Sequence, residues 1–450
     1  MLPSAFCARM QALLGEEYPA FFTAMTEGEA EHALRVNTVK LAQEELSLPF
    51  PAEKIPYTAD GFYHAEEKIG KYPHHHAGMI YSQDPGAMSA AASLPDLRGA
   101  RVLDTCAAPG GKSAQLAAAI GEEGVLVSNE YVPSRCKLLV GNVERLGIPN
   151  ALVLNGDTGR LRELFPDYFD LTLVDAPCSG EGMFRKSEDA LSMWSEENVR
   201  ACAARQTGIL EDAAATVRGG GYLLYSTCTF SLEENEEQVA AFLARHPDFS
   251  LCDFPSAVHP YTVAGVPVKE AGTEKTRRFY PHIAPGEGQF MALMRRAQNA
   301  PVSESPAYKS EAEVPKGQDK AILAAFFENT FGDASLADRV VSLHGNLVLP
   351  PDIPLPKAGV FAAGVAVGEI RKGVLFPHHQ LFSAYGKHFS RKICLTAEDP
   401  RVEAYLHGDV IAAEGIANGY AAVLFEGCPL GGAKVVDGVA KNLYPKGLRQ

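Results

Sequence analysis

The chain has 450 residues, of which 46% are hydrophobic and 21% are charged, a balance typical of globular domains with sizeable cores. No segment approaches the roughly 20 uninterrupted apolar residues of a membrane span. The N-terminus lacks the features of a secretory signal, so we expect a cytoplasmic protein. Nine cysteines occur without any Cys-x-x-Cys pair, which argues against both a disulfide framework and a zinc finger.

The net charge of −14 gives no overall positive field that would attract a nucleic acid. The charge is uneven, however, since residues 371–450 carry +3 and residues 1–370 carry −17. A nucleic-acid partner is therefore not excluded, but its affinity would depend on individually placed basic side chains.

In chain order, residues 1–75 show helical patterns and few strand signals, beginning with an amphipathic helix over residues 1–17. Short apolar strands then alternate with helical segments from residue 101 to about residue 296. This alternation indicates an α/β, doubly wound domain whose ligands lie beyond the carboxyl ends of the strands. We predict strands over 101–104, 125–129, 151–154, 171–175 and 222–226, and helices over 113–120 and 134–146.

Residues 297–320 are rich in Pro, Ser, Glu and Lys and show no apolar periodicity, which is typical of a linker. The C-terminal part that follows contains strand signals over residues 410–412 and 421–425, separated by Gly and Asn turns. We therefore predict five parts, with bounds at 1–75, 76–296, 297–320 (the linker), 321–370 and 371–450.

The first predicted strand of the α/β domain leads into a loop of small residues, 105–112, in which two glycines let the backbone approach a ligand at a helix N-terminus. A P-loop is disfavoured because Cys106 occupies the position of its first glycine and Pro109 removes a backbone donor. Glu130 follows the second strand and Asp157 the third, where they can bind ribose hydroxyls and an adenine amino group. Because Gly-x-Gly-x-x-Gly is missing, the pattern favours a nucleoside site other than an NAD site.

Two cysteines follow the next two strands, Cys178 just after Asp175 and Cys228 just after Ser226. Either cysteine alone would more often be structural, but adjacent strand ends would direct both thiols, with Asp175, toward one crevice. This arrangement suits covalent catalysis at carbon 5 of cytosine, because a thiolate that adds to carbon 6 activates carbon 5. An acid such as Asp175 can hydrogen-bond or protonate N3, and the second thiol can assist release of the enzyme.

Three segments resemble the motifs of the nucleolar-protein/Sun family of RNA cytosine-5 methyltransferases. They are residues 104–112 (Asp-Thr-Cys-Ala-Ala-Pro-Gly-Gly-Lys), 174–180 (Val-Asp-Ala-Pro-Cys-Ser-Gly) and 225–229 (Tyr-Ser-Thr-Cys-Thr), with further matches at 35–38 and 286–288. The resemblance implies a Rossmann-like class I methyltransferase domain in which Cys228 is the nucleophile and Cys178 assists release. DNA cytosine methyltransferases instead attack with the Pro-Cys thiol, which here would be Cys178.

The resemblance also implies S-adenosylmethionine as the cofactor. We expect its contacts to come from the strand ends named above, with Arg135 added to the set: Cys106, Ala107, Ala108, Pro109, Gly110, Gly111, Lys112, Glu130, Arg135, Asp157 and Asp175. We expect no metal, because the consecutive histidines at 74–76 would rarely converge on one ion. The acidic run over residues 233–237 is predicted to be the solvated start of a helix.

Outside the catalytic domain, residues 13–18 and 434–446 are similar to RsmF-type bacterial members of that family, which modify 16S ribosomal RNA. This similarity implies an RNA-binding N-terminal region over residues 1–75 and a PUA-like RNA-binding barrel over residues 371–450. Basic side chains of the barrel could contact phosphates, although each alone would more often be a solvated surface residue: Lys387, Arg391, Lys392, Lys441 and Lys446.

The expected partner is therefore 16S ribosomal RNA in the small ribosomal subunit, and we expect a monomer. Two alternatives stay open at this point. The same chemistry could act on transfer RNA, or the chain could be a non-catalytic ribosome-assembly factor that binds RNA. Loss of a catalytic cysteine or of the cofactor loop would favour the non-catalytic factor. The sequence retains both cysteines and the loop.

Overall fold

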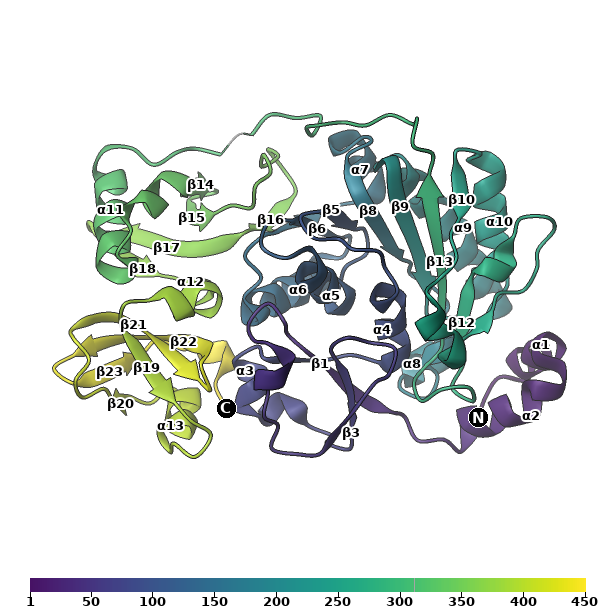
Figure 1. Cartoon of the computed structure of the whole chain (residues 1–450), viewed down its shortest axis with the longest axis horizontal. Coiled ribbons are helices and arrows are strands. Elements are labelled where there is room, and N and C mark those ends of the chain that lie inside the picture. Colours follow the sequence, from purple (N-terminus) through teal and green to yellow (C-terminus); the bar gives the residue numbers. More distant parts are fainter. Residues whose placement is uncertain (311) are drawn as a thin grey trace.

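A computed structural model describes residues 1–310 and 312–450 (Figure 1). Within this part of the chain, the strands form four sheets, of which the largest has ten strands. Its main path runs in the order β11-β12-β13-β9-β8-β5-β6-β7-β16, and β10 pairs with β13. The doubly wound α/β fold expected from the sequence is thereby confirmed.

Five strands at the centre of the large sheet are parallel, and the strand order reverses between β5 and β8. Ligands of such sheets bind at the carboxyl ends of the strands near this switch point. The central strands match the predicted ones closely: β5 (Arg101–Asp104), β6 (Val125–Glu130), β7 (Ala151–Asn155), β8 (Phe169–Asp175) and β9 (Val217–Thr227). The strands that flank them are β10 (Phe249–Leu251), β11 (Val263–Ala264), β12 (Arg277–Phe279) and β13 (Gln289–Arg296).

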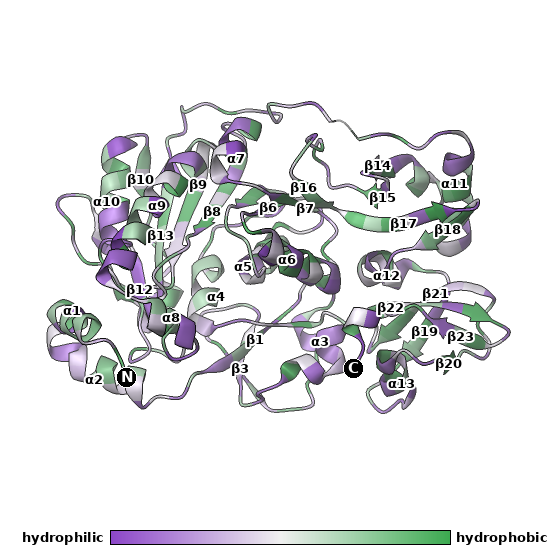
Figure 2. Ribbon diagram, turned by 180° about the vertical axis from the view of Figure 1, so that it is seen from behind, coloured by the Kyte–Doolittle hydropathy of each residue, from purple (hydrophilic) through white to green (hydrophobic). Residues whose placement is uncertain are grey.

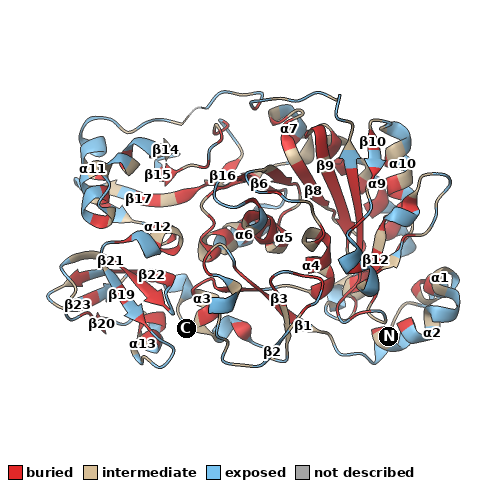
Figure 3. Cartoon of the chain, viewed as in Figure 1, coloured by how far each residue is buried: buried red, intermediate tan, exposed pale blue. Residues whose placement is uncertain are grey.

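Helices cover both faces of this sheet, so its central strands are buried along most of their length (Figure 3). Leu173 of β8 belongs to the same core cluster as Leu116, whereas the next residue, Val174, belongs to the cluster of Leu210. Both side-chain directions of a strand therefore pack into cores, which explains the continuous apolar runs in the sequence. The helices of this domain are α4 (Pro85–Ala92), α5 (Gly111–Ile120), α6 (Pro133–Leu146), α7 (Thr158–Leu164), α8 (Glu188–Met193), α9 (Glu196–Ala214) and α10 (Glu236–Arg245).

The N-terminal region contains two helices and a small sheet with the order β2-β3-β1-β4. The amphipathic first helix is confirmed, since Phe6 and Met10 are buried, but the region holds more strand than the sequence indicated. The strands are short, and β2 lacks a buried face, so no alternation marks them. The elements are α1 (Ser4–Leu14), α2 (Tyr18–Thr26), β1 (His32–Val36), β2 (Ala52–Lys54), β3 (Gly61–His64), α3 (Pro73–His76) and β4 (Ile80–Ser82).

The C-terminal part forms two further sheets, ordered β14-β15-β17-β18 and β19-β21-β22-β23-β20. Its strand β16 (Val360–Ala363) instead joins the large sheet, antiparallel to β7. Strand β22 is largely buried and shows mostly hydrophobic residues in Figure 2. The remaining strands are β14 (Val341–Leu343), β15 (Asn346–Leu349), β17 (Val365–Arg371), β18 (Val374–Pro377), β19 (Lys392–Leu395), β20 (Ile411–Ala412), β21 (Gly419–Phe425), β22 (Cys428–Val436) and β23 (Val439–Asn442).

Three helices accompany these sheets: α11 (Gly317–Phe331), α12 (His379–Tyr385) and α13 (Arg401–His407). The domain bounds at residues 75, 296, 320 and 370 stay predictions; β4 lies beyond the first bound and pairs with β1. Among the described residues, no helix is both long enough and apolar enough to cross a membrane.

Candidate active site

The loop between β5 and α5 begins at a buried carboxylate, Asp104. Ser113 Oγ donates to Asp104 Oδ2 at 2.7 Å, and burial raises the pKa of Asp104 to about 7. Gly110 has a φ of +114°, a conformation that favours glycine. Burial also raises the pKa of Cys106 to about 12, so this cysteine of the loop remains a thiol at neutral pH.

The N-terminal sheet supports this loop from outside through Arg35, the first residue of the matched segment 35–38. The Arg35 guanidinium is buried, donates to Gly111 O at 3.0 Å, and forms an ion pair with Asp60 at 2.9 Å. A Cβ atom at Gly111 would lie 3.2 Å from the ring of Tyr81, so the loop and the sheet approach closely there. Arg35 therefore fixes the position of the loop backbone.

The next two strand ends carry the predicted acidic residues. Glu130 is buried at the end of β6, and its Oε1 accepts from Val132 N at 2.8 Å. Arg135 lies nearby, 3.8 Å from Glu130, and donates to Ala108 O at 2.8 Å. Asp157 is exposed and caps α7 by accepting from Arg160 N at 3.0 Å.

The two predicted catalytic cysteines lie side by side, with 3.2 Å between Cys178 Sγ and Cys228 Sγ. They follow β8 and β9, which are parallel neighbours with Asp175 opposite Ser226. The hydrogen bond to Cys228, together with burial, raises the pKa of Cys178 well above the usual cysteine value. The two thiols are therefore close enough to share a hydrogen bond, in which either sulfur can be the donor.

Asp175 connects the cysteines to the cofactor loop. Its Oδ1 accepts from Ser226 Oγ at 2.7 Å, and its Oδ2 accepts from Lys112 Nζ at 2.9 Å. Burial alone would lower the pKa of Lys112, but the acidic groups around it, Asp175 foremost, together outweigh that effect and the pKa is raised. Lys112 is therefore a cation at neutral pH, held between the loop and the cysteine pair.

Two buried carboxylates of the site, Glu181 and Glu234, were not predicted from the sequence as site residues. Glu181 accepts from Trp194 Nε1, Thr229 Oγ1, Phe230 N and Ser231 Oγ, each at 2.9 Å. Glu234 accepts from Ser179 N at 3.0 Å and from Gln206 Nε2 at 2.8 Å, and burial raises its pKa. Both therefore bind the loops that carry the cysteines.

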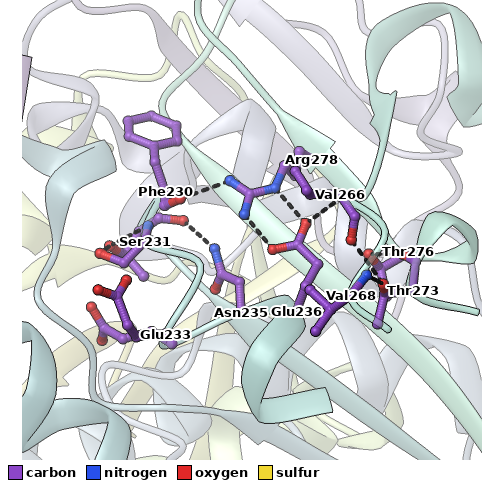
Figure 4. Close-up of polar contacts among 12 residues, drawn as sticks. Phe230, Ser231, Glu233, Asn235, Glu236, Val266, Val268, Thr273, Thr276 and Arg278 are labelled. Atoms are coloured by element: carbon purple, nitrogen blue, oxygen red, sulfur yellow. Dashed lines mark hydrogen bonds and ion pairs between the residues drawn. The ribbon is translucent and has the colours of Figure 1, made fainter. Parts of the chain in front are cut away.

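The prediction that residues 233–237 are solvated is wrong, because Glu234, Asn235 and Glu236 are all fully buried. Figure 4 shows Glu236 paired with Arg278, whose guanidinium also donates to Phe230 O at 2.8 Å. Helix α10 begins only at Glu236, so the first part of the run turns inward beneath the cysteine loops. No feature of a run of acidic residues distinguishes buried members from solvated ones.

Two of the three consecutive histidines, His74 and His76, pack between the N-terminal and C-terminal parts. The His74 ring contacts Phe425 edge-on, and His76 Nδ1 lies 2.7 Å from Tyr444 Oη. Burial lowers the pKa of both histidines, so they are neutral near pH 7. Among the described residues, no group of His, Cys, Asp or Glu is arranged to hold a metal ion.

The predicted phosphate-binding residues fall into two groups. Lys387 Nζ contacts Lys40 O, and Arg391 donates to Asn329 O at 3.1 Å, so both have partners within the chain. The other three are exposed on the C-terminal sheet and its flanks: Lys392, Lys441 and Lys446. Contact of these side chains with RNA stays a prediction.

Three family models match the chain: 16S rRNA methyltransferase RsmB/F over residues 92–295, the N-terminal domain of 16S rRNA methyltransferase RsmF over 2–85, and the methyltransferase RsmF PUA domain over 392–450. A relative from Erwinia tasmaniensis, named ribosomal RNA small subunit methyltransferase F, is 30% identical across 99% of this chain and 96% of its own. The chain belongs to the RsmB/F methyltransferase family. The resemblance noted in the sequence is thereby confirmed.

Other relatives agree with this membership. A protein of the same name from Vibrio campbellii is 32% identical across 99% of this chain and 97% of its own. The solved structure of a methyltransferase homolog protein from Pyrococcus horikoshii has a TM-score of 0.57 and 27% identity, covering 65% of this chain and 95% of that one. The chain is therefore a methyltransferase, and its cofactor is S-adenosylmethionine.

The strand ends suit this cofactor. Asp104 Oδ1 and Asn129 Oδ1 are buried acceptors without a hydrogen-bond partner among the described residues. Buried acceptors of this kind normally have hydrogen-bond partners. Because these two oxygens have none in the described part of the chain, they can accept a hydrogen bond from a ligand or from water. Glu130 adds a buried carboxylate at the end of β6, where ribose hydroxyls are bound in folds of this type.

Proposed function

We propose that this chain methylates carbon 5 of a cytosine in 16S ribosomal RNA, with Cys228 as the covalent nucleophile. The observation that carries the proposal is the pair of thiols, 3.2 Å apart, beside a carboxylate that is bound by a lysine of the cofactor loop. The names of the relatives, ribosomal RNA small subunit methyltransferase F, favour small-subunit ribosomal RNA over transfer RNA as the substrate.

The cofactor would be held by residues 106–112 together with Glu130, Asp157 and Asp175, with Arg135 bracing the loop through Ala108 O. S-adenosylmethionine supplies an electrophilic methyl group on a sulfonium centre. Lys112 orients Asp175, since its Nζ binds one carboxylate oxygen while Ser226 Oγ binds the other. Asp175 is thereby held in one orientation at the strand end.

Catalysis would begin when the Cys228 thiolate forms a bond with carbon 6 of the target base. The electron pair of the C5–C6 double bond then makes carbon 5 nucleophilic, and charge develops at N3. In its protonated form, Asp175 would hydrogen-bond N3 and give its proton to N3 as this charge develops, leaving a carboxylate that Lys112 binds. The target base must leave any stack to reach the two cysteines.

Release would involve Cys178. After carbon 5 gains the methyl group, a base must remove its proton before the C5–C6 double bond re-forms and the Cys228 sulfur leaves. The Sγ–Sγ distance supports Cys178 as the group that assists the departure of the Cys228 sulfur, to which its thiol can donate a proton.

A gel experiment tests this assignment. Cys228→Ala should bind S-adenosylmethionine and RNA yet transfer no methyl group. Cys178→Ala should form the bond to carbon 6 but release it slowly, so a covalent protein–RNA species should accumulate on a denaturing gel. The opposite pattern, an adduct with Cys228→Ala and no methyl transfer with Cys178→Ala, would reverse the two roles.

A further inference from the structure

The segment that follows Cys228 turns back beneath both cysteine loops before α10 begins. Its residues Glu234 and Asn235 are fully buried, although their types are usually exposed. A buried polar side chain is costly unless it is hydrogen-bonded, so the partners of these two residues indicate what they do.

Asn235 binds the residues on either side of Cys228. Thr227 Oγ1 donates to Asn235 Oδ1 at 2.6 Å, and Asn235 Nδ2 donates to Thr229 O at 2.9 Å. Figure 4 shows the Asn235 side chain directed toward this loop, beside Phe230 and Ser231. One side chain therefore holds the Thr227 hydroxyl before the proposed nucleophile and the Thr229 carbonyl after it.

Glu234 and Gln206, which lies in α9, hold the residues on either side of Cys178. Ser179 N donates to Glu234 Oε2 at 3.0 Å, and Gln206 Nε2 lies 2.8 Å from the same oxygen. Gln206 Nε2 also donates to Pro177 O at 3.0 Å. The peptide groups on both sides of Cys178 are thereby held.

Further contacts join the two loops to each other and to the sheet. Ser179 Oγ lies 2.8 Å from Thr229 Oγ1, and Gly182 N donates to Cys228 O at 2.9 Å. Glu236 anchors the segment through its buried ion pair with Arg278 of β12. Because Glu234 and Asn235 are consecutive, a single peptide unit relates the Cys178 loop to the Cys228 loop.

We propose that Glu234 and Asn235 are positioning residues that hold the two thiols at their working separation. The proposal rests on the proposed function for its catalytic meaning, but the separation itself can be measured without RNA. A displacement of about 1 Å at a reacting centre can reduce a rate by about 100-fold, so small changes in these contacts should affect turnover.

The test compares three variants with the wild-type chain: Glu234→Gln, Asn235→Asp and the control Glu237→Gln. Glu237 is exposed on the first turn of α10, so its substitution makes the same chemical change away from the loops. The first measurement is the rate at which the oxidant diamide joins Cys178 to Cys228, followed by peptide mapping. Two thiols lose two protons and two electrons to form the disulfide, and the azo bond of diamide is reduced to a hydrazine.

Disulfide formation requires closely spaced, correctly directed thiols, so we expect it to slow by roughly tenfold or more in Glu234→Gln and Asn235→Asp. The second measurement is methyl transfer, where we expect kcat to fall by about 10- to 100-fold with little change in KM for RNA. Glu237→Gln should behave as wild type in both. Unfolding midpoints show whether each variant is folded. If Asn235→Asp does not fold, Thr227→Val replaces it, because this substitution removes the hydroxyl that donates to Asn235 Oδ1.

Unchanged crosslinking in folded Glu234→Gln and Asn235→Asp would overturn the positioning role, whatever their activity. Slower crosslinking with an unchanged kcat would overturn it as well, since the separation would then not matter for turnover. If the wild-type chain crosslinks but methylates no RNA, the proposed function fails, and the crosslinking rates alone decide whether the two residues set the separation.

Discussion

Asp104, at the entrance to the cofactor loop, illustrates how burial changes the chemistry of a single side chain. Its pKa rises from 3.8 to about 7 on folding, so between these pH values the folded chain retains a proton that the unfolded chain has released. The contribution of Asp104 to stability is therefore complete below about pH 4 and is lost as the pH rises through 7. The loss is on the order of 4 kcal/mol.

Asp104→Asn should remove this dependence. We expect the variant to lose less free energy of unfolding than the wild type between pH 4 and pH 8, measured by urea denaturation without cofactor. Other groups titrate in the same pH range. The effect of Asp104 is therefore the difference between the two proteins in how the free energy of unfolding changes with pH. Identical slopes against pH in the two proteins would contradict the burial effect.

Residue types at strand ends made part of this site predictable. Asp175, Cys178 and Cys228 follow apolar strands, and parallel strands bring their carboxyl ends together. Glu181 and Glu234 were not predictable, because a carboxylate shows its burial only through partners that are distant in the chain. Gln206, for example, is 28 residues from Glu234.

At the scale of elements, the N-terminal helices α1 and α2 pack against the segments that follow both cysteines. The Phe21 ring lies 5.2 Å from that of Phe230, and the Phe6 ring lies 5.1 Å from that of Phe184. Phe230 is two residues beyond Cys228. These helices therefore belong to the support of the active-site loops as well as to the N-terminal region.

Phe21→Ala should destabilise the chain by about 3–4 kcal/mol, the usual cost of removing a buried aromatic ring. The neighbouring residue provides a matched control, because Phe21 is 0% exposed and Phe22 is 39% exposed. Urea denaturation of Phe22→Ala should show a much smaller change. Equal effects of the two substitutions would mean that the packing of α2 on the catalytic domain contributes little.

The elements differ in how far the sequence could predict them. Strands β5 to β9 have apolar runs because both of their faces are buried, and their positions were predicted closely. Strand β2 has only three residues and no buried face, so it left no such pattern. Strand β16 joins β7 from about 200 residues away, and local periodicity carries no information about a pairing at that distance.

At the scale of the whole molecule, Lys40 joins four segments. Its Nζ lies 2.8 Å from Ala77 O, 3.0 Å from Arg145 O, 3.1 Å from Ser383 Oγ and 3.2 Å from Pro429 O. The N-terminal region, α6, α12 and β22 therefore meet at one side chain. This contact fixes the C-terminal sheet relative to the catalytic domain, an arrangement that no single segment of the sequence reveals.

Lys40→Met should loosen that junction, because it leaves buried carbonyl oxygens without their donor at about 1–3 kcal/mol each. Hydrogen exchange at β22 and at the C-terminal end of α6 should become faster, whereas the exposed Lys392→Met should leave exchange unchanged. Unchanged protection in Lys40→Met would show that other contacts hold the domains together.

Lys40 also predicts a dependence on pH. Burial lowers its pKa from 10.5 to about 7, so between these values the unfolded chain holds a proton that the folded chain has released. The stability that Lys40 contributes is complete above about pH 10.5 and is lost as the pH falls through 7. Measured by urea denaturation, Lys40→Met should therefore show a smaller gain in stability than the wild type between pH 7 and pH 9. An equal gain in both proteins would contradict this effect.

The most direct test of the central claim is transfer of labelled methyl from S-adenosylmethionine to three unmodified substrates: small ribosomal subunits, free 16S RNA and bulk transfer RNA. We predict label in 16S RNA, recovered as 5-methylcytosine and absent when Cys228→Ala replaces the wild-type chain. Label confined to transfer RNA would retain the chemistry and contradict the proposed substrate. Label in a nucleoside other than 5-methylcytosine, or methyl transfer that persists in Cys228→Ala, would contradict the proposed reaction itself.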